Sequence, residues 1–257
     1  MRLSFVVPAY NEETGLRECL ESIAAQIRHL GNDAEIVVVN NASTDRTREI
    51  ALSVAGVRVV EEPRKGLTYA RQAGYVASSG ELIANVDADA RLPPGWVEGA
   101  LAAFAANPRL VAFSGPLVYY DMSMAQRAVV RMFFWPAKAL YALNRYVLRV
   151  GSLVQGGNFI LRRDAVEKMG GFNTHIAFYG EDTDVARRIF PFGDVDFSLK
   201  FNIFTSGRRL LYEGVMRIGL RYSINYLWTL FLGRPFTKTY IDIRRQADGT
   251  LRATPGQ

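Results

Sequence analysis

The sequence is poor in the residues that build disulfides and histidine metal sites. Its 257 residues include one cysteine, Cys19, and two histidines. A single cysteine cannot form an internal disulfide, and its presence suits a reducing compartment. Because the sequence has no uninterrupted apolar run of about 20 residues, it predicts no membrane span. We also expect no cleavable signal, because a strand pattern begins within a few residues of Met1.

The sequence also lacks two common nucleotide-binding signatures. It contains neither Gly-x-Gly-x-x-Gly nor the phosphate-binding loop Gly-x-x-x-x-Gly-Lys-Ser/Thr, so neither a dinucleotide site nor an ordinary NTPase site is expected. What is present is an ordinary globular composition, with 49% apolar residues, 22% charged residues and a net charge of +6. A chain of this length can bury a sizeable core.

Residues 1–90 alternate between strand patterns and helix patterns. Apolar runs predict the strands, and a 3.6-residue apolar periodicity predicts the helices. The strands are expected at 2–7, 35–39, 57–61 and 82–86, and the helices at 16–30, 46–54 and 67–79. Strands joined by helices at this spacing run parallel, with right-handed crossovers. The sequence therefore predicts an α/β fold with a mostly parallel sheet flanked by helices.

Polar side chains follow each of these predicted strands. The carboxyl ends of parallel strands share one rim of the sheet, where α/β proteins bind ligands, so these side chains are expected to lie together. They are Asn11, Glu12, Asn40, Asn41, Lys65, Asp87 and Asp89. Helix N-termini at the same rim favour a phosphate-bearing ligand.

Asp87 and Asp89 directly follow the strand that ends at Val86. In an extended backbone, side chains two residues apart point in the same direction. Mg²⁺ commonly takes one or two carboxylates together with phosphate oxygens and water. The pair therefore indicates a site for a metal ion and a phosphate, and the alternative is a solvated turn after a strand.

Four segments of residues 1–90 resemble, in order and spacing, the successive blocks of family-2 glycosyltransferases. They are Val6-Val-Pro-Ala-Tyr-Asn-Glu-Glu13, Val39-Asn-Asn-Ala-Ser-Thr-Asp-Arg-Thr47, Gly66-Leu-Thr-Tyr-Ala-Arg71 and Asp87-Ala-Asp89. The resemblance implies a nucleotide-diphospho-sugar transferase fold of the GT-A type. It also implies a metal-dependent, inverting sugar transfer with Mg²⁺ or Mn²⁺ as cofactor. The absence of Gln-x-x-Arg-Trp disfavours a processive polymer synthase.

The resemblance further implies a donor site for a UDP- or GDP-linked sugar. The implied donor-binding residues are Pro8, Ala9, Tyr10, Glu12, Asn40, Asn41, Lys65, Arg71, Asp87 and Ala88. Asp89, helped by Asp87, is the implied metal ligand. The family commonly has two aspartates where this chain has Asn40 and Asn41, and an acidic residue there contacts the base. An amide oxygen can accept a hydrogen bond but carries no charge, so the identity of the base stays open.

Three later segments resemble the acceptor side of the same family. They are Gly156-Gly-Asn158, Gly170-Gly-Phe172 and Gly180-Glu-Asp-Thr-Asp184. The resemblance implies acceptor-side positions at Gly157, Asn158 and Glu181, and a catalytic base at Asp182. Inversion needs a carboxylate that takes the proton of the attacking acceptor hydroxyl. If the acceptor is already a phosphate, no base is needed and Asp182 binds or orients the acceptor instead.

Residues 122–163 carry seven basic side chains and no acidic one. On a helical wheel, five of the basic residues fall within about 40° of each other, amid apolar and aromatic neighbours. They are Arg127, Arg131, Lys138, Arg145 and Arg149. Such a stripe is typical of a helix in a membrane interface, and the alternative is a buried helix pair whose charged stripe faces water. The apolar surroundings argue against a nucleic-acid partner.

Together these patterns predict a single glycosyltransferase domain over residues 1–257. Its parts are a nucleotide-sugar half at 1–90, an acceptor half at 91–210 with a basic amphipathic insertion at 122–150, an amphipathic helical segment at 211–246 and a loose tail at 247–257. The expected acceptor is a lipid or lipid-linked glycan, and the expected location is the cytoplasmic, inner face of the cell membrane. The alternatives are a nucleotidyltransferase of the same fold and a catalytically silent membrane-associated protein.

Overall fold

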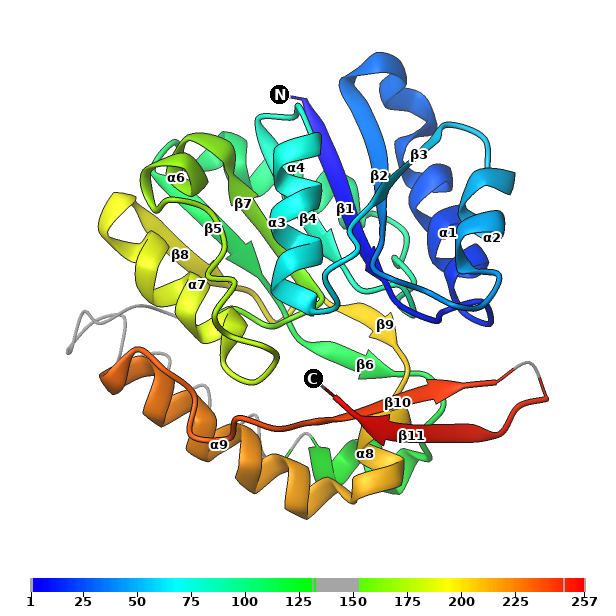
Figure 1. The fold of residues 1–257 in the computed structure, drawn as a ribbon. Coiled ribbons are helices and arrows are strands. Elements are labelled where there is room, and N and C mark those ends of the chain that lie inside the picture. The colour runs from blue at the N-terminus through cyan, green and yellow to red at the C-terminus, as the bar shows by residue number, and fades with distance from the viewer. Residues whose placement is uncertain (1, 131, 133–152, 247, 257) are drawn as a thin grey trace.

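The computed structural model describes residues 2–130, 132, 153–246 and 248–256. Its centre is a seven-stranded sheet in the order β3-β2-β1-β4-β7-β5-β8, with helices on both faces (Figure 1). The strands are β1 (Leu3–Ala9), β2 (Ala34–Asn40), β3 (Val57–Glu61), β4 (Leu82–Val86), β5 (Leu110–Ser114), β7 (Asn158–Arg162) and β8 (Asp194–Phe197). The helices around it are α1 (Leu16–Ile27), α2 (Thr47–Ser53), α3 (Leu67–Ala77), α4 (Trp96–Ala106), α6 (Arg163–Lys168) and α7 (Glu181–Ile189). Two 3₁₀ helices, η1 (Arg28–Asp33) and η3 (Phe190–Phe192), follow α1 and α7.

The predicted alternation of parallel strands and helices in residues 1–90 is confirmed. β1 pairs in parallel with β2 and with β4, and β2 pairs in parallel with β3. Helices α1, α2 and α3 make the successive crossovers between these strands. The carboxyl ends of β1 to β4 therefore meet at one rim, which we call the carboxyl rim of the sheet.

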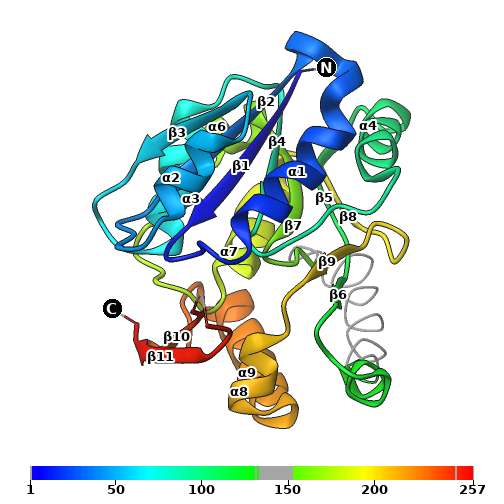
Figure 2. The ribbon, with the colours of Figure 1, turned by 90° about the vertical axis from the view of Figure 1, so that its right-hand side faces the viewer.

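A second layer lies beyond the carboxyl rim (Figures 1 and 2). It contains the paired strands β6 (Leu117–Tyr119) and β9 (Ile203–Thr205), the helices α8 (Arg208–Glu213) and α9 (Val215–Leu232), and a hairpin of β10 (Ile241–Arg245) and β11 (Leu251–Pro255). The expectation of a loose tail at 247–257 is wrong, because β11 pairs in register with β10 over its whole length. The sequence predicts α9 but not the short helix α8 before it, which Gly214 separates from α9 with a φ of 88°.

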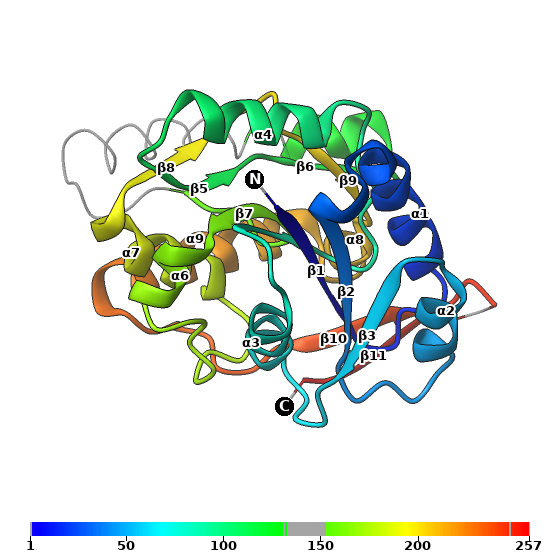
Figure 3. The same ribbon diagram turned by 90° about the horizontal axis from the view of Figure 1, so that it is seen from above.

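Side chains of β1 alternate between two apolar layers. Leu3, Phe5 and Val7 pack with α1 and α4 on one face, whereas Val6 packs with α3, α6 and α7 on the other. Figure 3 shows these two sets of helices on opposite sides of the sheet. Helix α3 approaches β1 closely because of Gly74, where an added Cβ would overlap the Val6 side chain.

Strand β7 departs from the parallel pattern. It lies between β4 and β5 and runs antiparallel to both. Its amino end therefore lies at the carboxyl rim, next to the residues that follow β4. Strand β8, which the sequence does not predict, extends the sheet beside β5. The segment that leads into β7 thus joins the loops of the parallel strands at one edge.

Most of the basic insertion predicted at 122–150 lies outside the described residues. Arg127 is the one member of the five-residue basic stripe that is described, and its Nη2 donates to the carbonyl oxygen of Tyr120 at 2.8 Å. The interpretation of this stripe as a membrane contact therefore stays a prediction. In the part of the chain that the structure describes, no helix combines the length and apolarity needed to cross a bilayer.

Candidate active site

A cavity of about 500 Å³ lies between the carboxyl rim and the second layer. This volume is within the usual range for small-molecule sites. Most of the residues predicted for the site line it, from both halves of the chain. They are Pro8, Ala9, Tyr10, Glu12, Asn41, Lys65, Arg71, Asp87, Ala88, Asp89, Glu181 and Asp182. The fold therefore gathers the predicted donor side and the predicted base around one space.

Asp89 occupies a buried, strongly charged part of this cavity. Its carboxylate accepts a hydrogen bond from Thr205 Oγ1 at 3.0 Å and lies 3.2 Å from Arg208 Nη2. Burial raises the pKa of Asp89 to about 6; Arg208 opposes this shift, whereas Glu12 and Asp87 add to it. Positive charge next to Asp89 is therefore favourable.

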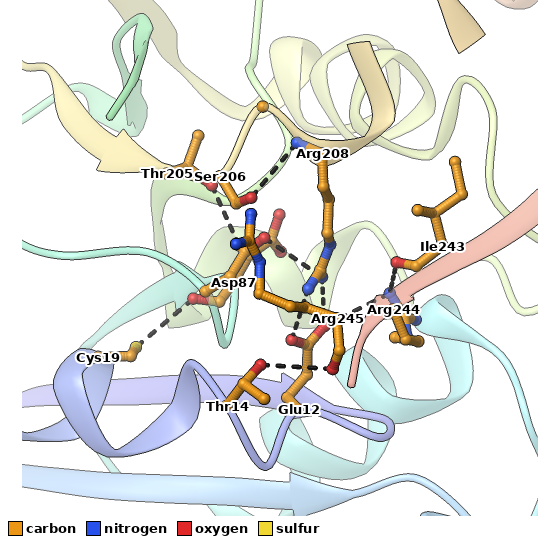
Figure 4. Close-up of polar contacts among 12 residues, drawn as sticks. Glu12, Thr14, Cys19, Asp87, Thr205, Ser206, Arg208, Ile243, Arg244 and Arg245 are labelled. Carbon is orange, nitrogen blue, oxygen red and sulfur yellow. Dashed lines mark hydrogen bonds and ion pairs between the residues drawn. The ribbon is translucent and has the colours of Figure 1, made fainter. Parts of the chain in front are cut away.

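Arg208 supplies such a charge from the first residue of α8 (Figure 4). Its Nη1 donates to Glu12 Oε2 at 2.8 Å, and its Nη2 contacts both Glu12 Oε1 and Asp89 Oδ2. Arg244 approaches the same Glu12 from the hairpin, with Nη1 3.4 Å from Oε1. The carboxylates of the nucleotide-sugar half are thus paired with cations of the second layer.

Arg71 connects the donor side to the acceptor side. It is 1% exposed, and its Nη2 lies 3.4 Å from Asp87 Oδ1 and 3.2 Å from Glu181 Oε1. Within the described residues, its Nε and Nη1 have no hydrogen-bond partner. A buried donor without a partner costs about 1–3 kcal/mol. Arg71 therefore has unused donor capacity at the wall of the cavity.

Asp182 lies in the first turn of α7. Its Oδ2 accepts a hydrogen bond from the Gly156 N–H at 3.1 Å, and its Oδ1 accepts one from the Thr183 N–H at 2.8 Å. Burial raises the pKa of Asp182, and the two backbone N–H groups only partly offset this rise. Burial also raises the pKa of the adjacent Glu181 to about 8, despite the guanidinium of Arg71 beside it. Two neighbouring carboxyl groups thus have different environments, and Asp182 has the N–H donors that support a carboxylate.

Asn40 and Asn41, the residues expected near the base, differ in their positions. Asn40 does not line the cavity, and its Nδ2 donates to Glu61 Oε2 at 2.7 Å. Asn41 lines the cavity, but its Nδ2 donates to the backbone oxygens of Glu62 and Arg64, at 2.9 and 2.7 Å. Its Oδ1 accepts from the Gly66 N–H at 2.8 Å. Asn41 therefore organises the loop after β3, whereas Asn40 pairs with the end of that strand.

Two predicted acceptor-side residues also have structural roles. Asn158 is fully buried beneath the rim, where its Oδ1 accepts from Trp96 Nε1 at 3.1 Å and its Nδ2 donates to the Phe201 oxygen at 2.8 Å. Gly157 has a φ of 78° and lies against Asp87, whose carboxylate an added Cβ would overlap. Neither residue lines the cavity, whereas the preceding Gly156 does. Asn158 fixes the start of β7, and Gly157 leaves the space that the Asp87 side chain occupies.

Several cavity residues of the second layer were missed by the sequence patterns. They are Arg208, Arg209, Tyr222, Asp242 and Arg244. The guanidinium carbon of Arg209 lies 4.4 Å from the ring centre of Phe178, and Asp242 Oδ2 lies 2.7 Å from Lys65 Nζ. Arg208 and Arg209 belong to the segment Thr205-Ser-Gly-Arg-Arg209, which resembles a further block of the family. Neither this resemblance nor the excess of basic residues after Thr205 says which strand ends these side chains meet.

The residues at Asp87 and Asp89 suit a divalent cation that is shared with a ligand. Among the residues described, no group of three or more His, Cys, Asp or Glu side chains is arranged to hold a metal ion by itself. Asp87 and Asp89 both line the cavity and offer carboxylate oxygens, which Mg²⁺ and Mn²⁺ prefer. Mg²⁺ commonly completes its coordination with phosphate oxygens and water. The residues present therefore fit a metal ion held jointly with a diphosphate.

The sheet order, the aspartates after β4 and the cavity at the carboxyl rim define an α/β protein of the nucleotide-sugar transferase type. The model of glycosyl transferase family 2 matches residues 4–170. The chain therefore belongs to glycosyl transferase family 2. The match ends before α7, so the second layer contributes most of its cations from outside the matched region.

Solved structures of sugar transferases share the fold. A mannosyltransferase from Pyrobaculum calidifontis, in complex with GDP-mannose and Mn²⁺, has a TM-score of 0.67 and 22% identity, over 90% of this chain and 63% of that one. Glucosyl-3-phosphoglycerate synthase from Mycobacterium tuberculosis, in complex with Mn²⁺ and UDP-glucose, has a TM-score of 0.61 and 20% identity, over 99% of this chain and 86% of that one. The predicted GT-A fold is confirmed.

Relatives by sequence are also transferases. An undecaprenyl-phosphate 4-deoxy-4-formamido-L-arabinose transferase of Pseudomonas paraeruginosa is 38% identical over 98 residues, which are 36% of this chain and 29% of the relative. A glucosyl-dolichyl phosphate glucuronosyltransferase of Haloferax volcanii is 23% identical over 256 residues, which are 93% of this chain and 76% of the relative. The match to the first relative thus spans less than a third of its length.

Proposed function

We propose that this protein transfers a sugar, with inversion, from a nucleoside diphosphate donor to a lipid or lipid-linked acceptor at a membrane surface. The observation that carries the proposal is that Asp87, Asp89 and Asp182 line one cavity. Arg71 spans the space between them, with contacts to Asp87 and Glu181. A donor diphosphate at Asp89 and an acceptor at Asp182 would then meet across Arg71.

The donor side is suited to a leaving diphosphate. Negative charge grows on the diphosphate as the bond to the sugar breaks, and fixed cations stabilise that charge without reorganising. Arg71 has two unpaired buried donors, and Arg208 and Lys65 line the same cavity. A divalent ion held by Asp89, with help from Asp87, would add Lewis-acid charge to the same oxygens.

The acceptor side is suited to proton removal. In an inverting transfer, Asp182 takes the proton of the acceptor hydroxyl as its oxygen attacks the anomeric carbon. Burial favours this role, because a carboxylate with a raised pKa is a stronger base. The first turn of α7 and two backbone N–H groups still support the ionised form before the reaction. For a phosphate acceptor, the same position orients the attacking oxygen.

Helix α9 supports an acceptor that comes from a membrane. One side of α9 lines the cavity with Tyr222 and Asn225. The other side exposes large apolar residues, among them Met216, Leu220 and Phe231, each more than 60% exposed. Exposed apolar surface of this kind marks a protein or membrane contact. Two relatives carry names that include undecaprenyl phosphate and glucosyl-dolichyl phosphate, which supports a membrane rather than a protein.

Calorimetric titration with UDP, GDP, CDP and ADP, with and without Mn²⁺, tests the donor site. We expect one nucleotide to bind, and to bind at least about ten-fold more weakly without Mn²⁺ or in Asp89→Asn. Asp164→Asn, on the far helix α6 with its side chain exposed, is the matched control and should bind like the wild type. If no nucleotide binds with or without metal, the proposed function is wrong.

A further inference from the structure

We infer that Asp242, on the C-terminal hairpin, provides the carboxylate that recognises the donor nucleobase, and that the preferred base carries a ring N–H. This inference rests on the proposed binding of a nucleoside diphosphate. The structure raises the question because, of the two asparagines at the position implied for base contact, Asn40 does not line the cavity and Asn41 uses its amide in loop hydrogen bonds. The site therefore needs another acceptor for the polar edge of a base.

Tyr10 marks where a planar group can stack in the cavity. Its ring is contacted by two cations, with Lys65 Nζ 4.3 Å and the Arg244 guanidinium carbon 5.3 Å from the ring centre. Asp242 connects to both of them: its Oδ2 lies 2.7 Å from Lys65 Nζ, and its Oδ1 lies 3.2 Å from Arg244 Nη2. Tyr10, Lys65, Asp242 and Arg244 all line the cavity.

The guanidinium of Arg244 occupies the position over Tyr10 that we propose for the base. It is a planar group over the Tyr10 ring that donates an N–H to Asp242 Oδ1. A uracil or guanine that displaced it would be a planar group over the same ring with an N–H of its own. Arg244 has another partner to move toward, because its Nη1 is already 3.4 Å from Glu12 Oε1.

The carboxylate of Asp242 is held in place by the hairpin. The Asp242 side chain is 3% exposed. Beside it, Tyr240 stacks on Phe178 with ring centres 4.8 Å apart, and Arg245 Nη2 lies 3.4 Å from Asp121 Oδ2. These contacts tie the hairpin to the loop before α7 and to the loop after β6. A fixed carboxylate discriminates between ligands better than a mobile one.

The charge of Asp242 determines which bases it accepts. A carboxylate has acceptor oxygens and no donor. The ring N–H of uracil donates to it, and guanine offers a ring N–H and an amino group side by side. The corresponding ring nitrogen of cytosine and adenine is an acceptor, which the carboxylate repels. We therefore expect UDP or GDP to bind at least about ten-fold more tightly than CDP and ADP, the size of one charged hydrogen bond.

The test combines Asp242→Asn with a nucleotide whose ring N–H is blocked by a methyl group, 3-methyl-UDP or 1-methyl-GDP. With the wild-type protein, methylation should weaken binding of the preferred nucleotide about ten-fold or more by calorimetry. In Asp242→Asn, the preferred nucleotide should bind about ten-fold more weakly, and methylation should then have little further effect. Asp248→Asn, the same change at the exposed tip of the hairpin, is the control and should behave as the wild type.

Three results would overturn the inference. A wild-type preference for CDP or ADP contradicts the charge argument. A uniform loss of affinity for all four nucleotides in Asp242→Asn, with the preference retained, would mean that Asp242 only positions Lys65. A methyl effect of equal size in wild type and variant would also exclude contact with the ring N–H. These outcomes leave the proposed function standing, whereas the absence of any nucleotide binding overturns the proposed function and the inference together.

Discussion

The two sides of the cavity are built in different ways. The nucleotide-sugar half places Glu12 and Asp87 directly after parallel strands, so the sheet fixes their positions. The second layer brings Arg208 and Arg244 from a short helix and a hairpin, outside the region matched by the family model. Because the first set is acidic and the second is basic, each compensates the other. The donor side is therefore completed by a part of the chain that contributes no strand to the central sheet.

The largest expected effect separates chemistry from donor binding. Asp182→Asn removes the charge of the proposed base but keeps the size of the side chain. We expect kcat to fall about 10²–10⁴-fold, while the calorimetric Kd for the donor nucleotide changes less than about three-fold, because Asp182 lies across Arg71 from the donor residues. Because burial raises the pKa of Asp182, the acid limb of kcat/KM in the wild type should lie above the ordinary aspartate pKa of 3.8. A variant with normal kcat would exclude the base role.

The next largest expected effect is on membrane partitioning, and it compares the outer surface of the second layer with that of the nucleotide-sugar half. Leu220→Glu combined with Phe231→Glu places charge on the exposed side of α9, and partitioning onto phosphatidylglycerol vesicles should fall about 100-fold. Val76→Glu on α3 alters an equally exposed apolar residue of the nucleotide-sugar half and should leave partitioning unchanged. Sedimentation of protein with vesicles measures both. Equal partitioning of all the variants would contradict a membrane contact through α9.

The smallest expected effect is the coupling free energy between the nucleotide-sugar half and the second layer. Glu12→Gln and Arg208→Gln each break the pair between the nucleotide-sugar half and α8. In a double-mutant cycle by urea unfolding, the double variant should be more stable than the sum of the single losses predicts, by about 1–3 kcal/mol. Arg17 and Glu21, an exposed pair within α1, provide the control cycle, where the coupling should be under about 0.5 kcal/mol. Additive losses for Glu12 and Arg208 would contradict the coupling.

The nucleotide-sugar half was predictable because its signals are local. Apolar periodicity locates β1 to β4 and their helices, and parallel topology then brings Glu12, Lys65 and Asp87 to one rim. Asp182, which the resemblance identifies as the catalytic base, lies in the first turn of α7 and lines the same cavity. In these cases the position of a residue within one strand or helix is enough to say where its side chain lies.

The second layer was not predictable because its contacts are not local. Asp242 meets Lys65, and Arg208 meets Glu12, across most of the chain. No periodicity or spacing encodes such partners. Asn41 and Asn158 show a different limit, because polar residues at the expected positions can be used by the backbone around them. Sequence patterns can locate a polar residue near the site. They do not show which of its donor and acceptor atoms already form hydrogen bonds within the protein.

The antiparallel direction of β7 has a consequence for variation among related enzymes. The segment between β6 and β7 leaves from Tyr119 in the second layer and re-enters the sheet at Asn158, on the carboxyl rim. Insertions or exchanges in this segment leave the strand order and the residues after β4 in place. Variation in this segment can therefore change the edge of the cavity, which Gly156 lines, without changing the order of the strands.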